Sequence, residues 1–67
     1  MFNRTNMKIA LAKRNWTQED IAKCLNCSKQ VVSYRMCGKN LWTLNDIDKL
    51  KKNGFTNQEL YAIFLAD

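Results

Sequence analysis

The chain has 67 residues, enough for one small domain with a single apolar core. It lacks both the run of about 20 apolar residues that crosses a bilayer and the apolar stretch of a secretory signal near its start. Its three cysteines leave at least one without a partner within the chain, which argues against a disulfide framework and suits a reducing compartment. We therefore expect one cytoplasmic domain, residues 1–67, with no membrane partner.

The net charge of +5 is unevenly distributed. Residues 1–18 carry four basic residues and no acid, and residues 28–40 carry three basic residues and no acid. Such segregation is typical of a protein that binds a polyanion. A solvated basic surface would give the same pattern, so charge alone leaves both interpretations open.

Caps and apolar spacing predict five helices and no strands. Thr17, Thr43 and Thr56 are each followed three residues later by an acid, the spacing of a capping box, although only the glutamate after Thr56 matches it strictly. Ser28 is a fourth N-cap, and Asn53-Gly54 ends the fourth helix. The positions that mark the helix faces are, in chain order, Met7, Ala10, Leu11 and Arg14; Ile21, Ala22 and Leu25; Val31, Val32 and Met36; Leu44, Ile47 and Leu50; and Leu60, Tyr61, Ile63 and Phe64.

Only Asn26 and Cys27 separate the second and third helices. A connection that short, with a residue at position 26 that tolerates the left-handed conformation, forces a sharp crossing. This is the helix-turn-helix arrangement, whose second helix enters the major groove of DNA. We predict an all-α domain of five helices with a helix-turn-helix in helices two and three.

Residues 17–39, TQEDIAKCLNCSKQVVSYRMCGK, resemble the helix-turn-helix of the lambdoid repressor and Cro-type family. The chain departs from the family at Asn26, where glycine is usual, at Cys37, where asparagine is frequent, and at Arg35, where many relatives are apolar. The later segments WTL and TNQELYAIF resemble short regulators from phages of Gram-positive bacteria. The matching positions are Thr17 and Gln18 at the start of the first motif helix, Ala22 and Leu25 within it, Ser28 and Val32 in the recognition helix, and Gly38 and Lys39 at its end.

The third helix, residues 28–37, carries the candidate base contacts. Because Val31, Val32 and Met36 are expected to face the core, the side chains left for the groove are Lys29, Gln30, Ser33 and Tyr34. Glutamine can pair with adenine through two hydrogen bonds, and lysine can donate to guanine. A tyrosine can touch a thymine methyl group or donate to a phosphate. The resemblance points to Lys29, Gln30 and Tyr34 as well.

Phosphate contacts are expected around the same helix. Gln18 lies in the first turn of the second helix, where relatives commonly hold a phosphate and where free backbone amides suit an anion. Each candidate can also be an ordinary polar surface residue. The further candidates are Ser28, Arg14, Arg35, Lys39 and Asn40.

Cys24 and Cys27 have a spacing that can hold a metal or form a redox pair. A structural zinc site usually needs four ligands, and the chain has no histidine. A redox pair would need a βαβ context that the pattern lacks. We therefore expect packing cysteines, an exposed Cys37, and neither metal nor other cofactor.

The aromatic residues divide into two groups. Trp16 and Trp42 each precede a threonine cap and are expected to cover the core as hydrophobic staples. A domain this small cannot bury every large apolar side chain, so Tyr61, Phe64 and Leu65 are candidates for a homodimer surface. A dimer would place two recognition helices about 34 Å apart, one turn of DNA.

Together these features predict a sequence-specific regulator of transcription that binds double-stranded DNA, resembling a Cro-like phage repressor. We expect a homodimer at least on its operator, in the cytoplasm and nucleoid of a bacterial host, without a small-molecule effector. Without histidine, a phosphate-binding loop or a base near its cysteines, the chain is not expected to be an enzyme. The alternatives are a protein-interaction module of the same fold that binds DNA weakly, and an antitoxin or excision-control regulator.

Overall fold

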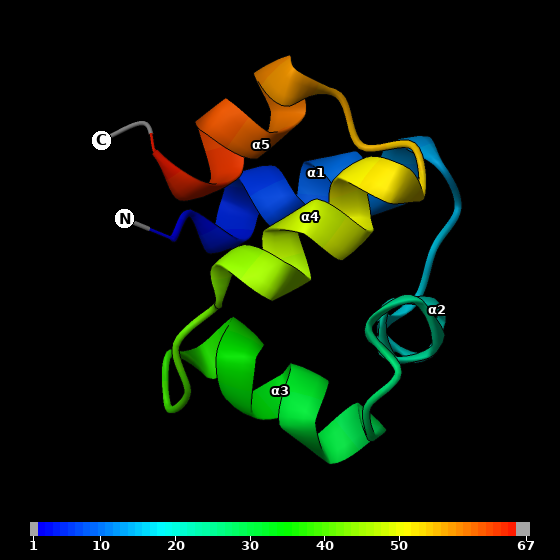
Figure 1. Cartoon of the computed structure of the whole chain (residues 1–67), viewed down its shortest axis with the longest axis vertical. Helices are drawn as coiled ribbons and strands as arrows, with labels where there is room; N and C mark the ends of the chain where they lie inside the picture. Colours follow the sequence, from blue (N-terminus) through cyan, green and yellow to red (C-terminus); the bar gives the residue numbers. More distant parts are fainter. Residues whose placement is uncertain (1, 66–67) are drawn as a thin grey trace.

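The computed structural model describes residues 2–65, which form five α-helices and no β-strand (Figure 1). The helices are α1 (Arg4–Lys13), α2 (Gln18–Leu25), α3 (Lys29–Cys37), α4 (Leu44–Lys52) and α5 (Asn57–Phe64). The domain measures 26 × 23 × 20 Å along its three principal axes. The predicted all-α fold with five helices is confirmed. Within residues 2–65, no helix combines the length and apolar character that a membrane crossing requires.

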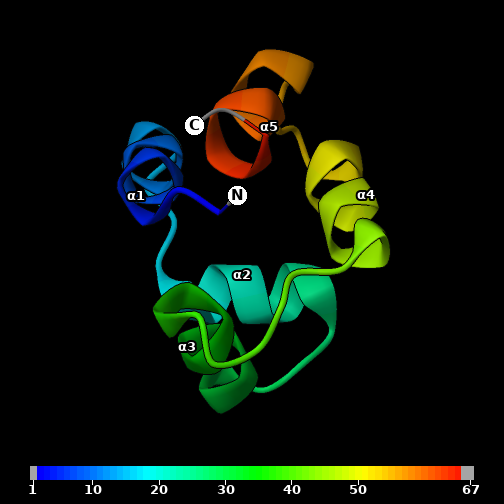
Figure 2. The same ribbon diagram turned by 90° about the vertical axis from the view of Figure 1, so that its left-hand side faces the viewer.

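The helices form two groups. In Figure 2, α1, α5 and α4 stand around the upper half of the molecule, and α2 and α3 lie beneath them. Helix α1 packs on α5, α4 packs on α5 and on α2, and α2 packs on α3. Helix α3 therefore lies at one end of the molecule and α5 at the other.

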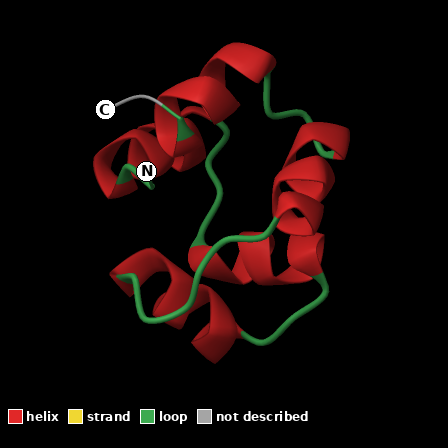
Figure 3. Cartoon of the chain, turned by 60° about the vertical axis from the view of Figure 1, so that its left-hand side comes forward, coloured by secondary structure: helices red, strands yellow, loops and turns green. Residues whose placement is uncertain are grey.

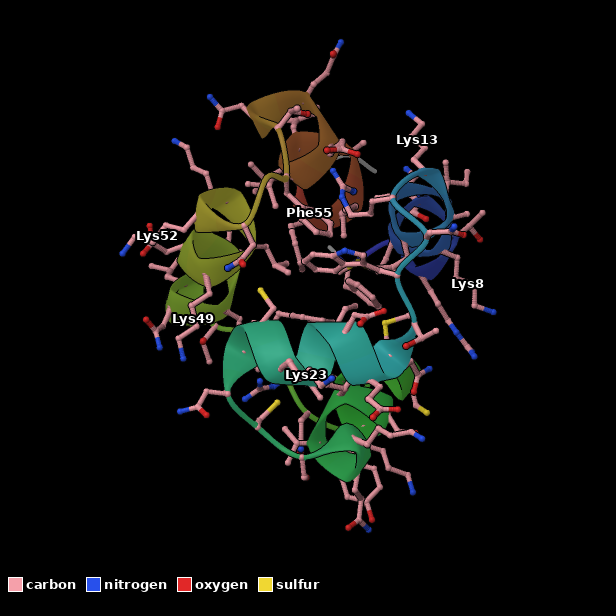
Figure 4. The ribbon with its side chains drawn as sticks, turned by 90° about the vertical axis from the view of Figure 1, so that its right-hand side faces the viewer. Lys8, Lys13, Lys23, Lys49, Lys52 and Phe55 are labelled. Atoms are coloured by element: carbon pink, nitrogen blue, oxygen red, sulfur yellow. The ribbon has the colours of Figure 1, made fainter. Side chains whose placement is uncertain are left out.

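The core lies where all five helices meet. The five largest fully buried side chains come one from each helix: Met7, Ile21, Val32, Leu50 and Ile63. The α4–α5 loop contributes a further buried side chain, Phe55, which points inward above α2 (Figure 4). One compact core thus fixes the positions of all five helices.

The predicted caps are confirmed. Each of Thr17, Thr43 and Thr56 accepts from the backbone N–H of the acid three residues later, and that acid accepts from the threonine N–H in return. The shorter aspartates complete this reciprocal pair as well as glutamate does, with Asp20 2.8 Å from the Thr17 nitrogen. Helix α1 begins at an Asn3 cap that the sequence pattern did not indicate.

The predicted turns are also confirmed. Asn26 has a φ of 57° and Gly38 a φ of 86°, so both helices of the motif end in the left-handed conformation. Asn26, Cys27 and Ser28 lie between α2 and α3, one residue more than the pattern predicted. Figure 1 shows α2 nearly end-on while α3 runs across the view, so the two helices cross steeply.

Some predicted core positions differ. Leu44 is 85% exposed because it is the first residue of α4, before the helix turns toward the core. Val31 is only half-buried, beside the fully buried Val32. Trp16 and Trp42 pack half-buried against the core, as expected of covering residues.

Candidate nucleic-acid interface

The outer face of α3 is polar and carries no acid. Val32 and Met36 are buried against the rest of the domain, whereas Lys29 and Gln30 are exposed. Ser33 is half-buried, so it offers less surface to a ligand than the pattern indicated. Since α3 lies at the end of the molecule, no other helix within residues 2–65 covers this outer face (Figures 1 and 2).

Two side chains of α3 and one from the loop that follows it form one cluster, which we call the Tyr34 cluster: Gln30, Tyr34 and Lys39. The Gln30 amide nitrogen donates to the Tyr34 hydroxyl oxygen at 2.8 Å. The Lys39 ammonium lies 5.2 Å from the centre of the Tyr34 ring, within the range of a cation–π contact. The structure therefore brings together three side chains that the sequence indicates only as separate contacts.

The start of α3 is open toward an anion. The Ser28 hydroxyl accepts from the Val31 N–H at 3.2 Å, which leaves its own hydrogen available. The first turn of α3 contains no acid, so no side chain there offsets the positive end of the helix dipole.

Beside this helix start is a shallow hollow of about 460 Å³, whose lining contains Lys23 and Lys29 and also one acid, Glu19. Lys23 projects outward from α2 (Figure 4), and the sequence analysis did not select it.

The α3–α4 loop stays close to the end of α3. The backbone N–H groups of Lys39 and Asn40 both donate to the Tyr34 carbonyl oxygen, at 2.9 and 3.3 Å. Figure 3 shows the loop turning back past α3 before it reaches α4. Lys39 and Asn40 are exposed there, and Gln18 is half-buried in the first turn of α2. All three candidates are therefore at least partly accessible to a ligand.

Arg14 is committed elsewhere. Its guanidinium donates to both carboxylate oxygens of Glu59, at 2.8 and 3.1 Å, and to the Ala10 carbonyl oxygen at 2.7 Å. It also lies 4.0 Å from the centre of the Phe55 ring. The hydrogen bond from Arg14 lowers the pKa of the Glu59 carboxyl from 4.5 to about 2. Because Arg14 joins α1 to α5, we leave it out of the proposed phosphate contacts.

Arg35 is likewise used within the domain. It pairs with the buried Asp46 at 3.1 Å, and its backbone carbonyl accepts from the Trp42 indole N–H at 3.2 Å. Asp46 also caps α4 through Thr43. Arg35 therefore anchors α3 to α4, and we leave it out of the proposed phosphate contacts too.

The candidate dimer residues separate into different environments. Phe64 is a core residue, 8% exposed, and packs against the rings of Phe2 and Trp42. It cannot offer an exposed surface to a second copy without unfolding the end of α5. Tyr61 and Leu65 are 59% and 68% exposed and remain candidates. The sequence analysis missed Leu41, which is 86% exposed in the α3–α4 loop and close in sequence to Leu44.

The cysteines occupy the packing positions that were predicted. Cys24 and Cys27 are half-buried against the core, and Cys37 is exposed. The Cys24 thiol lies 3.7 Å from the Lys49 carbonyl oxygen, and burial raises its pKa. Residues 2–65 contain no group of three or more histidine, cysteine or acidic side chains arranged to hold a metal ion.

A comparison of the chain with protein-family models, curated proteins and solved structures found no match in any of the three.

Proposed function

We propose that the chain is a sequence-specific DNA-binding regulator that inserts α3 into the major groove. The observation that carries the proposal is the outer face of α3: an uncovered, acid-free surface at the end of the domain, presented by a steeply crossing helix pair. Helix pairs of this kind fit the width of the major groove.

The exposed side chains have distinct roles in this proposal. Gln30 and Lys29 contact base edges, where a good bidentate pair contributes about 1–3 kcal/mol of discrimination. Ser28, Gln18, Lys39 and Asn40 contact phosphates and set the position of the helix in the groove. Regulation follows from occupancy, because a protein on a promoter operator blocks access by RNA polymerase.

A second copy on a two-fold related half-site completes the proposal. Two recognition helices about 34 Å apart would read successive major grooves on one side of the DNA. Tyr61 and Leu65 are the candidates for this contact in place of the buried Phe64. No small-molecule effector is proposed.

A second candidate function is a protein-interaction module. It is favoured by the exposed apolar side chains, since Leu41 and Leu44 are each at least 85% exposed. Exposed apolar groups in a small domain often mark a partner surface. This candidate predicts weak DNA binding without sequence preference.

The experiment that separates the two candidates is selection of bound duplexes from a random library, followed by titration of the selected duplex at several salt concentrations. The proposal predicts a two-fold related consensus bound roughly 1,000-fold more tightly than random DNA. Gln30→Ala should relax one position in each half-site. Gln58→Ala, which removes an exposed glutamine on α5, is the matched control and should change nothing.

If no consensus emerges and binding simply disappears as salt is raised, the basic surface is only an electrostatic patch. The regulator proposal would then be wrong, and the interaction module would be favoured.

A further inference from the structure

The hydrogen bond between Gln30 and Tyr34 constrains a side chain that would otherwise be free. Gln30 is exposed on the outer face of α3, where long side chains normally sample several rotamers. Tyr34 lies one helical turn further on, is half-buried, and holds the Gln30 amide at 2.8 Å. Lys39 covers the ring of the same tyrosine. The amide is therefore oriented before any ligand arrives.

The bond also determines which groups of Gln30 remain available. An amide has two N–H donors and one carbonyl acceptor. Tyr34 takes one donor, which leaves one donor and one acceptor side by side. Adenine presents the complementary pair in the major groove, an acceptor at N7 and a donor at N6.

Guanine presents a different pattern, with acceptors at both N7 and O6. A freely rotating glutamine amide can turn both N–H groups toward two acceptors. With one N–H held by Tyr34, the amide would instead bring its carbonyl oxygen against a guanine acceptor. The contact thus favours adenine over guanine without Tyr34 touching the base.

We propose that Tyr34 is a positioning residue that sets Gln30 to read adenine, so that each operator half-site carries an A·T pair at the Gln30 position. This inference rests on the proposed DNA-binding function and names the base that the site takes. Tyr34 keeps its own hydroxyl hydrogen, which is free to donate to a neighbouring phosphate.

The test uses the duplex selected by the full chain, remade with each of the four base pairs at the position that Gln30→Ala relaxes. The unaltered protein should prefer adenine over guanine there by about tenfold or more. Tyr34→Phe removes only the hydroxyl and keeps the ring beneath Lys39. This variant should have a preference for adenine over guanine that is about fivefold smaller, because one orienting hydrogen bond is lost. The Gln30→Ala/Tyr34→Phe double variant should show the same preference between adenine and guanine as Gln30→Ala alone, because Tyr34 acts through Gln30.

Two controls separate positioning from a merely structural role. The midpoint of thermal unfolding should be the same for Tyr34→Phe and the unaltered chain. In the free protein, the two side-chain N–H resonances of Gln30 should move on Tyr34→Phe, whereas those of Gln58 should not.

An unchanged adenine preference in Tyr34→Phe would overturn the inference, even if affinity fell equally for all four duplexes. A preference for guanine in the unaltered protein would overturn it as well. Both results leave the DNA-binding proposal in place. Failure to select any consensus with the unaltered protein would overturn the proposed function and this inference together.

Discussion

Helices α3 and α5 are nearly equal in length, yet they are held in the domain in different ways. Helix α5 buries Leu60, Ile63 and Phe64, and Glu59, the acid of its capping box, is paired with Arg14. Helix α3 buries only Val32 and Met36, and its first turn contains no acid. Helix α5 is fixed along a broad apolar face, and α3 is fixed along a narrow one.

The difference indicates where each helix can accept ligands. A broad buried face leaves few positions of α5 for polar groups that serve a ligand. In α3, two apolar side chains and the Arg35–Asp46 ion pair hold the helix from inside. The other positions of α3 are not needed for packing and can carry polar side chains. Two of them, Gln30 and Tyr34, belong to the Tyr34 cluster.

The largest effect is expected from Ile63→Ala in α5. Removing a fully buried isoleucine side chain should lower the free energy of unfolding by about 2–4 kcal/mol, through lost burial and the cavity left behind. Lys29→Ala on the exposed face of α3 should change it by less than about 0.5 kcal/mol. Urea denaturation followed by circular dichroism measures both. Similar losses in the two variants would remove the basis of the comparison.

Asp46→Ala tests the anchor of α3. The substitution removes the acid of the α4 capping box and leaves Arg35, 19% exposed, without its carboxylate. We expect a loss of about 2–3 kcal/mol in the free energy of unfolding. Asp48→Ala is the matched control, because Asp48 pairs with Lys52 on an exposed face and should contribute less than about 0.5 kcal/mol. Equal effects would show that Arg35 does not depend on Asp46.

Glu59 makes the α5 side of the domain sensitive to acid. Its pKa is about 2 in the folded protein against an ordinary value of 4.5, because it accepts hydrogen bonds first from Arg14 and then from Thr56, so these contacts stabilise the fold fully above pH 4.5. The whole shift corresponds to about 3 kcal/mol. Because both side chains of the pair are partly exposed, solvent screening lowers the contribution to about 2 kcal/mol, which should be lost as the pH falls from 4.5 toward 2. Unfolding curves across this range measure it. The Glu59→Gln variant should be less stable at neutral pH and show a smaller loss over the same interval; an unchanged pH dependence would contradict the assignment.

The smallest change concerns salt. If Lys39 contacts a phosphate, Lys39→Ala should reduce the slope of log affinity against log salt by about 1, and weaken binding equally for all sequences. Lys13→Ala, on the far side of α1 from α3 (Figure 4), should leave the slope unchanged. Equal slopes in all three proteins would remove Lys39 from the proposed interface.

The features that sequence predicts here are local ones. A threonine followed by an acid three residues later forms its cap within four residues, and Asn26 and Gly38 need no distant partner to end their helices. Arg14 and Glu59, by contrast, are separated by 45 positions, so their ion pair depends on how α1 meets α5. The same holds for Phe64, whose burial depends on Phe2 and Trp42.

The candidate site likewise combines features that the local sequence predicts with contacts that depend on the fold. The outward positions of α3 follow from its helical period: Lys29 and Gln30 are exposed, and Ser33 and Tyr34 are half-buried. The period does not indicate that Gln30 is bonded to Tyr34, because both side chains also have solvent-facing rotamers. It also cannot assign Arg35 to Asp46, since that contact requires the position of α4.

The most direct test of the central claim is the NMR spectrum of the ¹⁵N-labelled chain during titration with the selected duplex. We expect the largest shifts at Lys29, Gln30 and Tyr34 and in the α3–α4 loop, with α5 little changed except where a second copy contacts it. Shifts centred on α1 and α5, with α3 unchanged, would contradict the assignment of α3 as the recognition helix.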